Sequence, residues 1–223
     1  SMIISFVNQK GGVGKSTLSF HFACWLAERG HSVGFFDADA QRSSSRWMAE
    51  YAPSMPLGSV DLTQPNAVPR QVLDLAEQVG IVICDGPGGL GEVTRTLLVL
   101  SDFAVFPIAA SFLDAESLAE ARAQLDYATS IHPATPPIAT VVLNKVRRRA
   151  RLARDARDAL RSIGINVMHA AVRDLDVFKL APQGRTTVWN LGRAGQQGTD
   201  DLDEVFGELL KLTGLHQEVA THG

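Results

Sequence analysis

Apolar runs of five to eight residues recur along the chain, and longer stretches with a helical period of apolar positions separate them. The runs are almost continuously apolar instead of alternating, which is typical of strands that are covered on both faces of a parallel sheet. The pattern predicts strands at 3–8, 32–37, 81–85, 103–109, 139–146 and 165–172.

The intervening stretches predict helices at about 16–29, 66–79, 92–100, 115–131, 150–163 and 200–212. Strands that alternate with helices indicate an α/β fold, with a mostly parallel twisted sheet, right-handed crossovers and helices on both faces. The remaining irregular stretches, at 52–59 and 132–137, are too short to be interdomain linkers. We therefore expect one domain over 2–215, followed by a tail at 216–223.

Composition and charge narrow the class of protein. The chain has 223 residues, of which 45% are hydrophobic and 20% charged, and its net charge is -3. These values are ordinary for a soluble globular protein, and any nucleic-acid binding would have to come from a local basic patch. The two cysteines lie far apart in apolar runs, which fits a reducing cytoplasm. No signal peptide or membrane-spanning stretch is recognisable.

A glycine-rich loop, KGGVGKST at 10–17, lies between the first predicted strand and the first predicted helix. Glycines let backbone N–H groups approach phosphate oxygens, and the helix N-terminus behind them favours an anion. We expect Lys15 to neutralise the β/γ oxygens, Ser16 to ligate Mg²⁺ and Thr17 to hold the α-phosphate. The predicted nucleotide contacts of this loop are Gly11, Gly12, Val13, Gly14, Lys15, Ser16 and Thr17.

Carboxylates end two of the predicted strands. Asp37 and Asp39 follow one apolar run and Asp85 ends another, at the edge of a parallel sheet where ligand sites gather. Asp85 has the position of a Walker B aspartate, which would reach Mg²⁺ through water. The alternative role for each carboxylate is to cap a helix or a loop.

The loop, the segments DADAQ at 37–41 and IVICDGPG at 81–88, and the pair Asn144-Lys145 together resemble the ParA/MinD superfamily of deviant-Walker-A ATPases, closest to its short ParF-like branch. The resemblance implies a P-loop fold, ATP and Mg²⁺ as cofactors, and a homodimer when ATP is bound. It implies that Lys10 reaches the phosphates bound by the other subunit, much as an arginine finger does.

The resemblance also implies roles for individual residues. Asp39 would orient or activate the attacking water, and Asp37 would join Ser16 and Asp85 around the metal. Asn144 would read the adenine, because an amide pairs with both a donor and an acceptor. Pro182 would line the base from a loop. The chain departs from the family pattern at Ala40, where proline is common, and at the Gly-Pro-Gly that follows Asp85.

A possible output surface is the segment 147–161, which holds seven arginines and two aspartates, an excess of +5. On a helical projection five of the arginines share an arc of roughly 120°. This face could contact the phosphates of non-specific DNA, or it could be a solvated face with ion pairs. The five arginines are Arg147, Arg151, Arg154, Arg157 and Arg161.

The resemblance implies an ATPase that partitions or positions DNA or a large cargo on the nucleoid, stimulated by a ParB-like or cargo-adaptor protein. One alternative is membrane positioning as in MinD, which would need a basic C-terminal helix where 200–214 is acidic. Another is a metabolic enzyme of the same fold, which would need an added substrate pocket. Because the loop begins at residue 10, we expect no operator-binding domain ahead of it.

Overall fold

A parallel sheet forms the centre of the molecule. The computed structural model describes residues 1–7, 14–61, 63–89, 91–112, 114–147 and 151–215. Within them the strand order is β3-β2-β4-β1-β5-β6-β7, and each recorded pair is parallel, as predicted. The strands are β1 (Met2–Phe6), β2 (Val33–Asp37), β3 (Leu57–Ser59), β4 (Ile81–Asp85), β5 (Phe103–Ala109), β6 (Ile138–Val146) and β7 (Asn166–Arg173).

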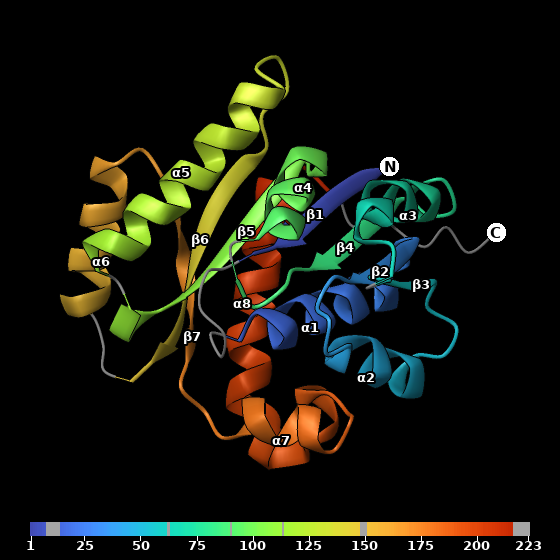
Figure 1. Cartoon of the computed structure of the whole chain (residues 1–223). Helices are drawn as coiled ribbons and strands as arrows, with labels where there is room; N and C mark the ends of the chain where they lie inside the picture. The colour runs from blue at the N-terminus through green and yellow to red at the C-terminus, as the bar shows by residue number, and fades with distance from the viewer. Residues whose placement is uncertain (8–13, 62, 90, 113, 148–150, 216–223) are drawn as a thin grey trace.

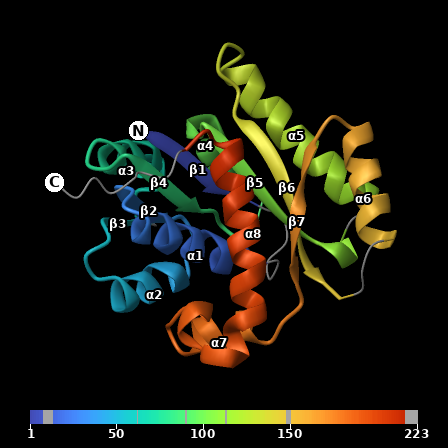
Figure 2. The same ribbon diagram turned by 180° about the vertical axis from the view of Figure 1, so that it is seen from behind.

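Helices cover both faces of the sheet, which confirms the predicted fold class (Figures 1 and 2). One face carries α1 (Lys15–Glu28), α2 (Ser43–Tyr51), α7 (Val177–Gln183) and α8 (Gln196–Leu212). The other carries α3 (Val68–Ala76), α4 (Glu92–Leu100), α5 (Ala115–Ile131) and α6 (Arg151–Ser162). Short 3-10 helices are η1 (Pro65–Ala67), η2 (Ala110–Phe112), η3 (Val188–Asn190) and η4 (Gly192–Gly195). None of the helices described here is both long and apolar enough to cross a membrane.

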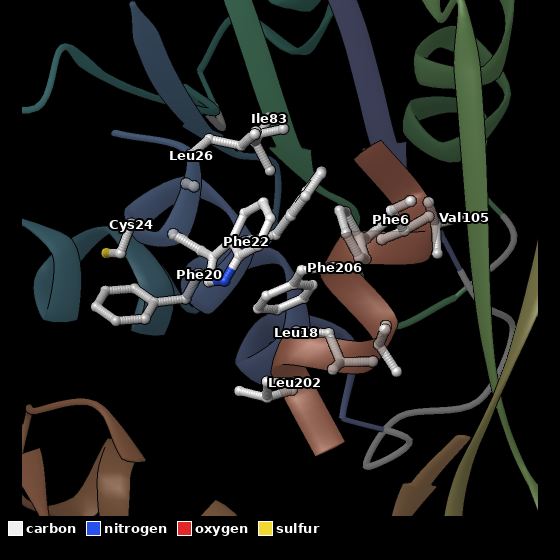
Figure 3. Close-up of a cluster of buried hydrophobic side chains, with 14 of the residues drawn as sticks. Phe6, Leu18, Phe20, Phe22, Cys24, Leu26, Ile83, Val105, Leu202 and Phe206 are labelled. Carbon is white, nitrogen blue, oxygen red and sulfur yellow. The ribbon is translucent and has the colours of Figure 1, made fainter. Parts of the chain in front are cut away.

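In the core, α1 and α8 lie side by side on one face of the sheet, with α1 on β1, β2 and β4 and α8 on β7. Phe206 of α8 packs on Phe22 of α1, with ring centroids 5.1 Å apart, and Phe22 in turn meets Phe6 of β1 at 6.0 Å (Figure 3). All three side chains are fully buried, and each contributes about 1.5–3 kcal/mol by leaving water. This packing fixes the direction of α1, whose N-terminus follows the glycine-rich loop.

Helix α2 and strand β3 were not predicted, because their sequences carry little local signal. Helix α2 begins with three serines, which are weak helix formers, and its start is stabilised by Asp37, which accepts the N–H of Ser45 at 2.8 Å. Strand β3 has three residues and lies in the stretch 52–59 that we read as irregular. A Cβ at Gly58 would lie 2.9 Å from the ring of Phe36, so close packing on β2 depends on that glycine.

The C-terminal region also differs from the prediction. Pro182 lies inside α7, although we expected a loop there, and the chain does not leave the helix until Gly184. Helix α8 starts at Gln196 instead of residue 200. A Cβ at Gly198 would lie 2.7 Å from Val177 Cγ1, so the first turn of α8 packs tightly against α7.

Strand register brings distant carboxylates together. Asp37 at the end of β2 pairs with Asp85 at the end of β4, and Asp85 pairs on its other side with Phe6 at the end of β1. Asn144 pairs with Ala109 on β5, farther along the same edge. The carboxyl edge of the sheet therefore collects most of the predicted site residues, where ligands of open α/β sheets bind.

Candidate nucleotide-binding site

The described part of the phosphate loop is its last glycine and the start of α1. Lys10, Gly11, Gly12 and Val13 lie outside the described residues. Gly14 has a φ of 82°, in the left-handed region that suits glycine, and its carbonyl accepts the N–H of Leu18 at 3.0 Å. A Cβ at Gly14 would also collide with Nδ2 of Asn144. Gly14 is thus required by both its backbone conformation and its neighbour.

Lys15 and Asp85 are both buried, and the charge of the lysine acts on the aspartate. The lysine is 6% exposed and the aspartate is fully buried. Burial raises the pKa of Asp85 to about 6, while the charge of Lys15 and the hydroxyls of Ser44 and Ser16 act in the opposite direction. Oδ2 of Asp85 accepts the hydroxyl of Ser44 at 2.7 Å. The other oxygen, Oδ1, is buried and accepts no hydrogen bond from the described residues.

The unpartnered oxygen of Asp85 fits a hydrated Mg²⁺. Burying a carboxylate oxygen that accepts no hydrogen bond costs free energy, unless a cation or a water molecule binds to it. Mg²⁺ prefers oxygen ligands, keeps several waters, and is held by one or two protein oxygens together with substrate phosphates. Among the described residues no group of three or more His, Cys, Asp or Glu side chains could hold a metal by itself. Asp85 with the Ser16 hydroxyl therefore suits a metal that arrives with a nucleotide.

Asp37 is used to order the loop that follows β2. Its Oδ1 accepts the N–H of Asp39 at 3.0 Å, and its Oδ2 accepts the N–H of Ser45 at 2.8 Å. The predicted direct role at the metal gains no support from these contacts. They match the alternative role of a capping carboxylate, which holds Asp39 and α2 in place.

Asp39 lies in the turn between β2 and α2 and is partly exposed. Its Oδ1 accepts the N–H of Gln41 at 2.9 Å, and its carbonyl accepts the N–H of Arg42 at 3.0 Å. Arg42 has a φ of 53°, which is unusual for a residue with a side chain, and its guanidinium donates to the carbonyl of Val60 at 2.9 Å. The turn directly follows Ala38, whose N–H donates to the carbonyl of Asp85 at 2.9 Å.

A cavity of about 300 Å³ begins at the phosphate loop and extends toward α7. It brings Asn144 and Pro182 together, as the sequence predicted for a base site. Asn144 lies two residues before the end of β6, and its Oδ1 accepts the N–H of Lys145 at 2.9 Å. Much of the apolar lining was missed by sequence reasoning, because it comes from β7, α7 and the turn between them. The residues missed there are Val172, Leu175 and Phe178.

The segment after α7 is held to α1 and α2 by side chains that the sequence did not single out. His21 is fully buried; it bonds the Thr17 carbonyl through Nδ1 at 2.7 Å and accepts the N–H of Val188 through Nε2 at 3.1 Å. Burial lowers the pKa of His21 to about 4, so the ring is neutral at pH 7. Trp47 of α2 donates to the carbonyl of Thr186 at 3.0 Å. The segment 186–188 is therefore fixed to α1 and α2 by these hydrogen bonds.

The arginine face is smaller than predicted. Arg147 precedes α6 and pairs with Asp174 at 2.7 Å, so it does not belong to the helix. Arg157 turns back to the sheet, where its Nη2 donates to the carbonyl of His169 at 2.6 Å. Arg154 and Arg161 are exposed, and the side chain of Arg151 lies outside the described residues. The five-arginine arc is thus interrupted by two side chains that bind the protein itself.

Replacing Asp85 with asparagine should stabilise the nucleotide-free protein. The pKa of Asp85 is about 6 in the fold against an ordinary 3.8, so its charged form is penalised by about 3 kcal/mol above pH 6. The free energy of unfolding of Asp85→Asn should exceed that of wild type at pH 7.5, and the gap should narrow as the pH falls from 6 toward 3.8. Urea unfolding at pH 7.5, 6 and 5, with Asp74→Asn on the exposed face of α3 as control, measures this. A gap that does not change with pH would refute the explanation.

Comparison with known proteins shows the family to which the chain is similar. Residues 4–188 match the family described as "CobQ/CobB/MinD/ParA nucleotide binding domain". The chain is 27% identical over 209 residues to Maintenance of carboxysome distribution protein A of Halothiobacillus neapolitanus, covering 93% of this chain and 95% of that protein.

Two solved structures share the fold. An aspartate-to-alanine variant of Cyanothece McdA in complex with ATP superposes with a TM-score of 0.77 at 17% identity, covering 98% of each chain. The septum site-determining protein MinD from Pyrococcus horikoshii with Mg-ADP has a TM-score of 0.65 at 18% identity, covering 95% of this chain and 98% of that one. The family match covers well over half of the chain, and the chain accordingly belongs to the CobQ/CobB/MinD/ParA nucleotide-binding family.

Proposed function

We propose that the protein is an ATPase that dimerises when it binds ATP and Mg²⁺, and that it positions DNA or a large cargo. The observation that carries the proposal is the buried Asp85, whose Oδ1 has no partner among the described residues, together with the buried Lys15, which lines a cavity with Asn144. The bound ligands named for the two solved structures, ATP and Mg-ADP, agree with it.

Each residue has a distinct task in this proposal. Lys15 neutralises the β/γ oxygens, and Ser16 and Asp85 hold the metal, which would neutralise developing charge on the phosphates. Asp39 orients the attacking water by accepting its hydrogen bond. Asp37 keeps Asp39 in place by accepting its backbone N–H, and it holds the start of α2 by accepting the N–H of Ser45. Asn144 recognises the adenine edge, while Pro182 and the apolar lining cover the ring.

Lys10 makes nucleotide binding and dimerisation one event. It lies outside the described residues, and its role follows from the resemblance of KGGVGKST to deviant Walker A loops. A lysine supplied by one protomer to the phosphates of its partner stabilises a dimer only while those phosphates are present. ADP, which lacks the γ-phosphate, would then release the dimer.

The output of the cycle is positioning, with non-specific DNA as the matrix and a partner protein that stimulates hydrolysis. The likeness to the carboxysome distribution protein, which spans 93% of this chain, supports an intracellular cargo of that general kind. The DNA contact rests on fewer arginines than the sequence indicated, chiefly Arg154 and Arg161. A dimer doubles this patch, and two weak contacts on one DNA bind much more tightly than one.

Light scattering tests the proposal. With a non-hydrolysable ATP analogue and Mg²⁺ the wild-type mass should double, and with ADP it should remain that of a monomer. Lys10→Ala should bind the analogue and stay monomeric, because the cross-subunit contact is lost. In a second arm, the analogue-bound dimer should bind random-sequence DNA with an affinity that falls linearly with salt on logarithmic axes, at a slope of about -0.9 per phosphate contacted.

The outcomes separate the candidate functions. A monomer with both nucleotides would contradict the dimerisation step. A dimer that ignores DNA but binds anionic lipid vesicles would favour the membrane-associated alternative. An Arg154→Glu, Arg161→Glu double variant that dimerises and retains wild-type DNA affinity would remove the arginine face from the proposal.

A further inference from the structure

One hydroxyl ties α2 to the buried carboxylate of the candidate metal site. Ser44 lies in the first turn of α2, is 2% exposed, and donates its hydroxyl to Oδ2 of Asp85 at 2.7 Å. The two residues are 41 positions apart in sequence. Because an ionised carboxylate can only accept, the proton of this bond belongs to the serine. An O–H donor to a carboxylate is among the stronger hydrogen bonds in proteins.

This bond makes the two oxygens of Asp85 inequivalent. Oδ2 is engaged by Ser44, whereas Oδ1 is buried without a hydrogen-bond partner among the described residues. A carboxylate that rotated freely about its χ2 angle would present either oxygen to a ligand. The Ser44 bond selects one orientation and leaves Oδ1 available to a hydrated cation near Lys15 and Ser16.

The same turn of α2 also restrains the loop that carries Asp39. The N–H of Ser45 binds Oδ2 of Asp37, and Oδ1 of Asp37 binds the N–H of Asp39. Ser44 and Ser45 are adjacent, so one helical turn contacts the carboxylates that end both β2 and β4. The Asp85 carboxylate and the Asp39 loop are therefore restrained by the same turn of α2.

We propose that Ser44 is a positioning residue, which orients Asp85 toward Mg²⁺ and couples the metal site to the loop that holds Asp39. The inference rests on the proposed ATPase function and adds a residue to its site. Sequence alone could not single out this hydroxyl, because Ser43, Ser44 and Ser45 are consecutive identical residues. Only the fold distinguishes the exposed first serine from the buried second one.

The test compares Ser44→Ala and Ser44→Cys with Ser43→Ala. Cysteine has the shape of serine with a larger terminal atom and is a weak donor, so it removes the strong bond without leaving a cavity. The matched control removes an exposed hydroxyl from the same helical turn. The first readout is the affinity of a fluorescent ATP analogue in EDTA. The second is the rise of the thermal unfolding midpoint with Mg²⁺ at a fixed concentration of a non-hydrolysable analogue.

Both Ser44 variants should need about tenfold more Mg²⁺ for half of the stabilisation, since loss of a partner that orients a metal ligand typically costs 10–100-fold. Their affinity for the analogue in EDTA should stay within twofold of wild type, as should both values for Ser43→Ala. A general loss of structure would instead weaken both affinities.

Two outcomes would overturn the inference. One is a Mg²⁺ curve for Ser44→Cys that coincides with wild type, and the other is an equal loss of affinity with and without Mg²⁺. Failure of the proposed function has a different signature, because wild type itself would then show no stabilisation by Mg²⁺ and the analogue.

Discussion

Replacing Lys15 with alanine should abolish nucleotide binding. The ammonium group is buried beside Asp85 and close to the N-terminus of α1, and its removal leaves the phosphates without their central cation. Truncating one partner of a buried charged contact between two binding partners costs about 2–5 kcal/mol of binding free energy, which corresponds to a fall in affinity of roughly 30- to 5,000-fold. Isothermal titration with an ATP analogue and Mg²⁺ measures the loss.

The matched control is Lys211→Ala, in the last turn of α8, where the side chain is exposed and remote from the cavity. It should bind the analogue as wild type does. Circular dichroism should show that Lys15→Ala keeps its helix content, since the core around Phe22 and Phe206 does not involve the lysine. Binding by Lys15→Ala within threefold of wild type would rule out the assigned phosphate site.

Replacing Asp39 with alanine should separate binding from hydrolysis. Turnover should fall by about 10²–10⁴-fold, the usual contribution of a positioned proton acceptor. Nucleotide affinity should be nearly unchanged, because Lys15, Asp85 and the base cavity remain intact. Without hydrolysis the ATP-bound dimer should accumulate, and light scattering with ATP itself should show a persistent dimer where wild type returns to monomer.

The control for Asp39→Ala is Asp74→Ala, which removes an exposed carboxylate paired with Arg70 on α3. Its turnover should match that of wild type. Steady-state phosphate release and nucleotide affinity, measured on the same preparations, distinguish a lost catalytic group from a lost binding site. Equal loss of affinity and turnover in Asp39→Ala would mean that the turn from 38 to 42 serves binding only.

Long, regular elements could be predicted from the chain, and short or unusual ones could not. Helices α4 and α5 begin and end where the helical period does, at 92–100 and 115–131. Helix α2 was missed because its start depends on Asp37, which reaches it from β2. Helix α7 was missed because a proline near the end of seven residues hides the period. In both cases tertiary contacts overcome weak local propensity.

Some residues of the candidate site could be predicted from the sequence, and others could not. The loop residues, the three aspartates and Asn144 were assigned from motifs, in which function depends on residue type and spacing. Ser44 and His21 carry no motif, and each acts through a partner on a separate element. Their roles became visible only when the fold brought those partners within hydrogen-bond distance.

In the basic segment 147–161, the sequence pattern predicted a continuous arginine face that the structure shows only in part. A helical projection assumes that every residue of a segment is helical and that its outer side chains are free. Arg147 precedes the helix and pairs with Asp174, while Arg157 binds a strand carbonyl. Charge counting therefore overlooked the partners that two of these arginines have within the protein, although the Arg147 side chain is 83% exposed.

By itself the sequence determined a parallel α/β domain, a phosphate loop and carboxylates at strand ends, since periodicity and motif spacing are properties of contiguous residues. The tertiary structure decided that Asp37 accepts the N–H groups of Asp39 and Ser45, that Ser44 donates to Asp85, and that Pro182 of α7 lines the same cavity as Asn144. These outcomes depend on contacts between residues that are distant along the chain. Such contacts arise because strand register and the packing of α1, α2 and α8 on the sheet place those residues within a few ångströms of one another.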